Sequence, residues 1–195
     1  MPKEVELPLT YKCNWHCDYC VVDTHNQPDL PYQEVLRRVH LIEPNSEVTF
    51  GGGEPGLLKR EQLEELIGIL KTKDCVIDLL TNGLFFKRHL PLIKEFGKIH
   101  YHCVEYLPSA IEFPNLQKEY DHIFYVLVVT NSNFLDGSIH EMIHRYPDIQ
   151  FLLLPDVRAQ RKINLNLMME FFRDHGNKVH PNSLQEFITV VSRYN

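Results

Sequence analysis

Three of the chain's five cysteines lie within eight residues, in the segment CNWHCDYC that runs from Cys13 to Cys20. In a reducing compartment, such clustered thiols are more typical of metal or redox sites than of disulfides. Three thiolates can hold a four-iron cluster and leave its fourth iron open to bind and activate a small molecule. The spacing of Cys13, Cys17 and Cys20 therefore favours an iron–sulfur site.

The spacing of these cysteines does not by itself exclude other functions. Structural zinc sites take four ligands, commonly as two separated CxxC-like pairs, and this sequence has no second pair. A Cys3His zinc site would need His16 or His25 as its fourth ligand. A thioredoxin-type pair needs only CxxC and leaves Cys13 unexplained. Buried structural thiols are the last alternative.

A second segment that could bind a ligand is GGGEP, residues 51–55, which follows a short apolar run. Consecutive glycines indicate backbone that passes close to another group or adopts positive φ. Glu54, beside exposed backbone amides, could hold an ammonium group. The alternative is an ordinary glycine-rich turn before a helix.

These segments need a scaffold that brings them together. Six apolar or β-rich runs predict strands, at residues 5–11, 47–50, 75–81, 98–106, 122–130 and 149–154. Helical periodicity separates most of them, at residues 31–42, 60–72 and 137–146. Alternating strands and helices predict an α/β fold with a parallel sheet, in which chemistry gathers at the carboxyl ends of the strands. Both segments lie at such ends.

Two further helices are predicted after the sixth strand, at residues 163–176 and 181–194. The intervals 84–96 and 107–121 contain prolines and predict a short helix or a loop. We expect Cys75 to be a small buried residue. Because side chains alternate along a strand, either His102 or Cys103 should lie on the inner face of the sheet.

The cysteine, glycine and strand-end motifs together resemble the radical S-adenosylmethionine (radical SAM) superfamily. The resemblance rests on CxxxCxxC with Tyr19 before its last cysteine, on GGE at 52–54 and on TNG at 81–83. It implies a partial (β/α)6 barrel of parallel strands over residues 1–157, with residues 158–195 as a C-terminal helical extension packed on that core.

The resemblance also implies two cofactors, a [4Fe-4S] cluster and S-adenosylmethionine (SAM). Three residues would ligate irons: Cys13, Cys17 and Cys20. The methionyl amine and carboxylate of SAM would chelate the fourth iron. Residues implied to bind SAM are Tyr19 near adenine, Gly52, Gly53 and Glu54 at the methionyl ammonium, Thr81 and Asn82 in the TNG motif, and Glu105 with Thr130 or Asn131 at the ribose.

The implied reaction is reductive cleavage of SAM to methionine and a 5′-deoxyadenosyl radical, which then abstracts hydrogen from a substrate. The electron would come from an external reductant such as flavodoxin or ferredoxin. The sequence is short and offers no cysteine motif for an auxiliary cluster. In both respects it resembles compact members of the superfamily, such as glycyl-radical activating enzymes and 7-carboxy-7-deazaguanine synthases.

The charge distribution bears on the substrate. The net charge of −6 argues against a general nucleic-acid coat, whereas residues 157–195 carry six Lys or Arg against three acids. This basic tail is either a solvated helical face or a patch for an anionic substrate. We expect Arg158 and Arg161 to bind a carboxylate, a phosphate or a nucleotide-like group, and His102 to contact substrate.

Three other functions are open: activation of a protein partner, a structural zinc-binding interaction protein, and a degenerate superfamily member that binds SAM without cleaving it. Residues 1–10 lack the pattern of a signal peptide, and no apolar run approaches about 18 residues. We therefore expect a soluble, cytoplasmic protein.

Overall fold

The protein is described by a computed structural model covering residues 2–17, 19–22, 26–103, 113–114, 116–130, 134–156, 165–185 and 188. It divides into two compact units, Met1–Tyr101 and His102–Asn195. The strand order is that of the chain, β1-β2-β3-β4-β5-β6. This confirms the predicted class, six parallel strands of the kind that form a partial (β/α)6 barrel.

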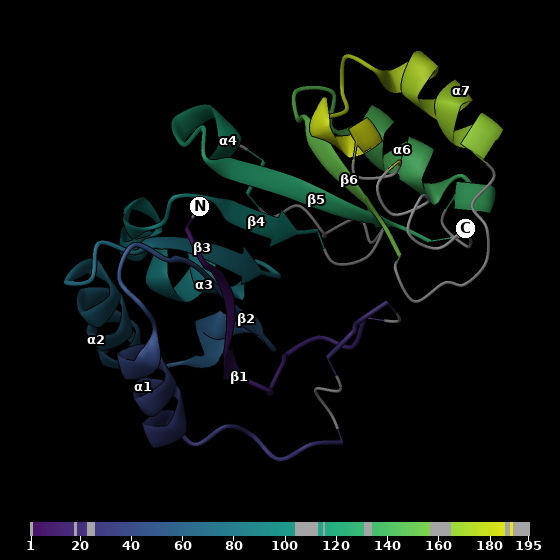
Figure 1. The fold of residues 1–195 in the computed structure, drawn as a ribbon. Coiled ribbons are helices and arrows are strands. Elements are labelled where there is room, and N and C mark those ends of the chain that lie inside the picture. The colour runs from purple at the N-terminus through teal and green to yellow at the C-terminus, as the bar shows by residue number, and fades with distance from the viewer. Residues whose placement is uncertain are drawn as a thin grey trace. The chain divides into compact units, whose positions relative to one another are not determined.

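The first unit alternates strands and helices (Figure 1). Its elements are β1 (Glu4–Thr10), α1 (Tyr32–Leu41), β2 (Glu47–Gly52), a 3-10 turn (Pro55–Leu57), α2 (Arg60–Lys71), β3 (Val76–Thr81), α3 (Leu84–His89), a second 3-10 turn (Leu90–Glu95) and the start of β4 (Ile99–His102). β1, β2, β3 and β4 pair in sequence and in parallel.

The second unit has the elements α4 (Leu116–Glu119), β5 (Ile123–Val129), α6 (Ser138–Arg145), β6 (Phe151–Pro155) and α7 (Leu165–His175). β5 pairs in parallel with β6. β5 is almost entirely apolar and buried, as expected of a parallel strand covered on both faces.

The helices of the first unit form because apolar residues recur on one face of each. α1 buries Val35 and Val39, while α2 buries a four-residue stripe: Leu63, Leu66, Ile67 and Leu70. α1 and α2 pack on each other and contact β1 and β3 respectively. The predicted helices 31–42, 60–72 and 137–146 agree with α1, α2 and α6 within one residue at each end.

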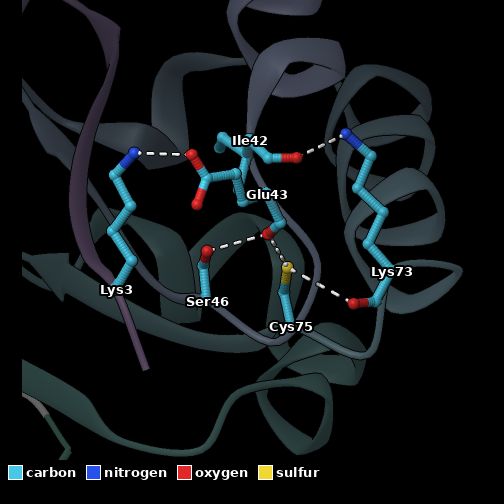
Figure 2. A network of polar contacts seen from close by, with 6 residues as sticks. All are labelled: Lys3, Ile42, Glu43, Ser46, Lys73 and Cys75. Atoms are coloured by element: carbon cyan, nitrogen blue, oxygen red, sulfur yellow. Dashed lines mark hydrogen bonds and ion pairs between the residues drawn. The ribbon is translucent and has the colours of Figure 1, made fainter. Parts of the chain in front are cut away.

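A polar network stabilises the turns that follow α1 and α2 (Figure 2). Lys73 Nζ donates to the carbonyls of Val39, His40 and Ile42 at 2.7–3.0 Å and so caps the C-terminus of α1. Cys75 Sγ lies 3.6 Å from the Glu43 carbonyl. Cys75 is half-buried, so the prediction that it is a buried residue was wrong: it precedes β3, which begins at Val76.

Along β4, residues alternate between the core and the opposite face. Tyr101 and Cys103 are buried, whereas His100 and His102 are half-buried on the other side.

The interval 84–96 forms α3 and a 3-10 turn. The predicted last helix, 181–194, is described only as a turn of helix at 182–185, and the boundary at 157/158 lies outside the described residues and stays a prediction. No helix in the described part of the chain has the length and apolar character needed to cross a bilayer.

Candidate cofactor site

The cysteine segment begins where β1 ends and is tied down by Asp29. The Asp29 carboxylate accepts from Thr10 Oγ1 at 2.6 Å and from the backbone amides of Tyr11 and Leu30 at 2.9 Å. Burial alone would raise the pKa of Asp29, but these hydrogen bonds and the Lys12 ammonium bring the pKa below its ordinary value. Asp29 thus joins residues 29–30 to the start of the cysteine segment.

The three cysteines lie in this segment as half-buried thiols. Cys17 and Cys20 are joined by a backbone turn, in which the Cys20 amide donates to the Cys17 carbonyl at 3.0 Å. Burial raises the pKa of the Cys13 thiol, and the negative charges of Glu54 and Cys20 add to this. Two N–H donors oppose the rise: the Trp15 amide at 3.4 Å and the Asn82 side chain at 3.5 Å from Cys13 Sγ.

The glycine segment packs directly against the cysteine segment. The Gly53 amide donates to the Thr10 carbonyl at 2.7 Å, and the Glu54 amide donates to the Lys12 carbonyl at 2.9 Å. A Cβ atom on Gly53 would lie 2.0 Å from the Lys12 carbonyl oxygen. Gly52 has φ +91°, and its Cβ would lie 2.6 Å from the Thr10 oxygen. Glycine is required here because the backbone approaches the residue before Cys13.

Glu54 joins the glycine segment to the end of β3. Its side chain is 1% exposed. Oε1 accepts from Thr81 Oγ1 at 2.9 Å and from the Gly56 amide at 2.8 Å, while Oε2 accepts from the Asn82 amide at 2.7 Å. Burial raises the pKa of Glu54, and the hydrogen bonds partly offset that rise. The carboxylate therefore holds two strand ends together.

Asn82 completes the connection back to the cysteine segment. Its Nδ2 donates to Asn14 Oδ1 at 3.0 Å and to Cys13 Sγ at 3.5 Å. The TNG turn continues with Gly83, which has φ +100° and packs against the Tyr101 ring. We call residues 10–14, 52–54 and 81–82 the strand-end site. All three motifs identified in the sequence meet there.

Not every predicted site residue belongs to this group. Tyr19 lies in the cysteine segment and is half-buried. Thr130 and His102 belong to the second unit, where Thr130 directly follows β5 and its carbonyl accepts from the Phe134 amide at 3.2 Å. Four predicted residues lie outside the described part of the chain: Glu105, Asn131, Arg158 and Arg161.

Sequence reasoning missed Asp29 and Asn14. Asp29 lies outside the motifs and contacts residues 18 or 19 positions away, while Asn14 is a variable position of CxxxCxxC whose contact with Asn82 spans 68 residues. The zinc alternative involved His16, which is exposed, and His25, which lies outside the described residues. Within the described residues, no group of three His, Cys, Asp or Glu side chains is placed to hold a single metal ion.

The fold and the strand-end site define a parallel α/β protein with a three-thiol segment after its first strand. Comparison with known families identifies it further: the model described as "Radical SAM superfamily" matches residues 7–104. The chain belongs to the radical SAM superfamily. Enzymes of that superfamily use a [4Fe-4S] cluster and SAM as cofactors.

Relatives with known names are longer than this chain. A GTP 3′,8-cyclase of Staphylococcus carnosus is 27% identical over 193 residues, which are 91% of this chain and 52% of that protein. The Aquifex aeolicus GTP 3′,8-cyclase is 32% identical over 105 residues, which are 49% of this chain and 32% of that protein. The chain thus spans about half the length of the curated relatives it matches, or less.

Solved structures agree on the fold. The structure of anSMEcpe with bound AdoMet and the Cp18Cys peptide aligns with a TM-score of 0.58 and 18% identity, over 78% of this chain and 50% of that chain. A second structure of anSMEcpe, with bound AdoMet alone, gives the same TM-score and identity over 80% of this chain and 52% of that chain. At this identity the likeness establishes the architecture only.

The residues of the cysteine segment fit the cluster, because iron–sulfur clusters are held by cysteine thiolates. Cys13, Cys17 and Cys20 come from one short segment as half-buried thiols, and Cys13 Sγ accepts from two N–H donors, which can also serve a negatively charged sulfur.

Proposed function

We propose that Cys13, Cys17 and Cys20 ligate the [4Fe-4S] cluster of this radical SAM enzyme and that the adjoining strand-end site binds the methionyl end of SAM. One observation carries the proposal: the GGE segment contacts Lys12, the residue directly before Cys13, through the Glu54 amide on the Lys12 carbonyl and through the close approach of Gly53. A cofactor bound to the cluster would therefore meet the glycine segment at once.

When bound, the cluster supplies one electron that cleaves SAM and releases a radical. The role of the protein is to bind SAM and to orient it. Gly52 and Gly53 have no side chains, so their backbone groups can approach the methionyl ammonium. Glu54 acts by charge and by holding that backbone in place, because its carboxylate oxygens accept three hydrogen bonds within the protein. Tyr19 lies in the cysteine segment and would offer backbone groups to adenine.

We further propose that Glu105, with Thr130 or Asn131, binds the ribose, and that an external reductant such as flavodoxin or ferredoxin supplies the electron. The radical would abstract hydrogen from an anionic or nucleotide-like substrate. The basic composition of residues 157–195 supports this, with Arg158 and Arg161 as the proposed anion ligands and His102 as a further contact. The names of the GTP 3′,8-cyclase relatives also fit a nucleotide-like substrate.

The test is anaerobic reconstitution with iron and sulfide, followed by dithionite and SAM. The proposal predicts a brown protein that forms 5′-deoxyadenosine and loses both properties in Cys13→Ser, Cys17→Ser or Cys20→Ser. Cys75→Ser is the matched control and should keep both, because Cys75 contacts carbonyls near the start of β3. A colourless protein with one equivalent of zinc would contradict the proposal, and brown colour without product would indicate a degenerate member.

Substrate class is tested separately. Nucleoside triphosphates added to the reconstituted enzyme should increase 5′-deoxyadenosine formation, and Arg158→Ala or Arg161→Ala should reduce that increase. The alternative is a protein partner, as in glycyl-radical activation. If both arginine variants respond to nucleotides as the unaltered protein does, the anion-binding role is wrong.

A further inference from the structure

The orientation of the Asn82 side chain is fixed by its neighbours. Asn82 Oδ1 accepts from the Leu84 amide at 3.2 Å. A backbone N–H group can only donate. A flipped amide would bring Nδ2 against that N–H and Oδ1 against Asn14 Oδ1. The surrounding donors and acceptors therefore assign the amino group to the side of Asn14 and Cys13.

The backbone of Asn82 is held as firmly as its side chain. Its amide donates to Glu54 Oε2 at 2.7 Å, and Glu54 is buried. A buried carboxylate acceptor anchors the residue against the GGE segment. Asn82 therefore presents its amino group to the Cys13 sulfur from a rigid turn at the end of β3.

Hydrogen bonds to ligand sulfurs change the reduction potential of an iron–sulfur cluster. Reduction adds negative charge to the cluster and its sulfurs, so an N–H donor stabilises the reduced state more than the oxidised state. Cys13 Sγ has two such donors, the Trp15 amide at 3.4 Å and Asn82 Nδ2 at 3.5 Å. Only the Asn82 donor is a side chain, so it is the one that substitution can remove.

We propose that Asn82 is a positioning residue whose amino group, aimed at Cys13 Sγ, raises the reduction potential of the cluster. This inference rests on the proposed ligation by Cys13. It gives the TNG motif of this chain a role in electron uptake, in addition to any contact with SAM.

The experiment measures the potential directly. Protein reconstituted without SAM is poised at a series of potentials, and the reduced cluster is quantified by electron paramagnetic resonance. Asn82→Ser keeps a short oxygen that can accept from the Leu84 amide but cannot reach Cys13. Loss of one hydrogen bond should change the oxidised-to-reduced ratio at fixed potential about fivefold, which is a decrease of about 40 mV at 59 mV per tenfold.

Asn82→Asp is the second variant, because it keeps the acceptor and replaces the donor by a negative charge. Its potential should fall at least as far. Asn177→Ser is the control: Asn177 is exposed in the second unit, and its potential should match that of the unaltered protein. An independent readout is selective ¹⁵N labelling of asparagine, which should give a weak coupling in the pulsed spectrum that Asn82→Ser abolishes.

The outcomes separate the two proposals. If the unaltered protein takes up no cluster, the proposed ligation and this inference both fail. If the cluster loads and Asn82→Ser and Asn82→Asp both keep the potential of the unaltered protein, the ligation stands and the inference about Asn82 is wrong.

Discussion

Gly53→Ala should disrupt the contact between the GGE and cysteine segments. The added Cβ would lie 2.0 Å from the Lys12 carbonyl oxygen, whereas ordinary van der Waals contact begins at 3.4 Å. The obstacle is backbone, so no side-chain rotation can relieve the clash. The two segments would have to separate by about 1.4 Å.

Such a displacement removes two hydrogen bonds. The Glu54 amide lies 2.9 Å from the Lys12 oxygen and the Gly53 amide 2.7 Å from the Thr10 oxygen, so both distances would pass beyond bonding range. At about 1 kcal/mol for each bond and about 1–3 kcal/mol for residual strain, the free energy of unfolding should fall by about 3–5 kcal/mol. That is a large share of the stability of an ordinary domain.

The assay is urea unfolding of the cluster-free protein under reducing conditions, followed by circular dichroism. Gly68→Ala is the matched control, because a Cβ on Gly68 in α2 meets nothing within 4 Å. That control should gain up to about 1 kcal/mol from helix propensity. A loss below about 1 kcal/mol in Gly53→Ala, with unchanged iron uptake, would refute the close approach as the reason for this glycine.

Three further predictions concern other contacts. Lys73→Met should lower the free energy of unfolding by about 2 kcal/mol because three carbonyls lose their donor, and the exposed Lys94→Met should change it little; equal effects would contradict the capping role. Burial, with the charges of neighbouring histidines, lowers the pKa of His175 below its ordinary 6.5. The unfolded chain therefore takes up the proton first, and the free energy of unfolding should fall as the pH drops through about 6.5. Denaturation at several pH values should show that His175→Gln flattens this dependence. Asp29→Asn should reduce iron uptake during reconstitution, because it weakens the contacts that hold the cysteine segment to the end of β1; iron content equal to that of the unaltered protein would refute this.

The sequence was sufficient for the fold and for the location of the strand-end site. Periodicity marks α1 and α2 because each buries one apolar face, and parallel strands bring their carboxyl ends together whatever the details of packing. The three motifs could therefore be expected to meet before any contact between them was known.

The contacts within the site were less accessible to sequence reasoning. Consecutive glycines indicate a close approach, but only the structure identifies the Lys12 carbonyl as the group approached. The sequence predicted Glu54 at a ligand ammonium, which stays a prediction, but did not indicate that its buried carboxylate joins two strand ends. Asp29 and Asn14 act through tertiary contacts that no local pattern encodes.

The most direct test of the account is the Mössbauer spectrum of protein reconstituted with ⁵⁷Fe, recorded before and after addition of SAM. Because three thiolates leave one of the four irons open, SAM should shift the signal of about a quarter of the iron and leave the rest unchanged. A spectrum that does not respond to SAM, from a protein shown to carry a complete cluster, would contradict an open iron held beside the glycine segment.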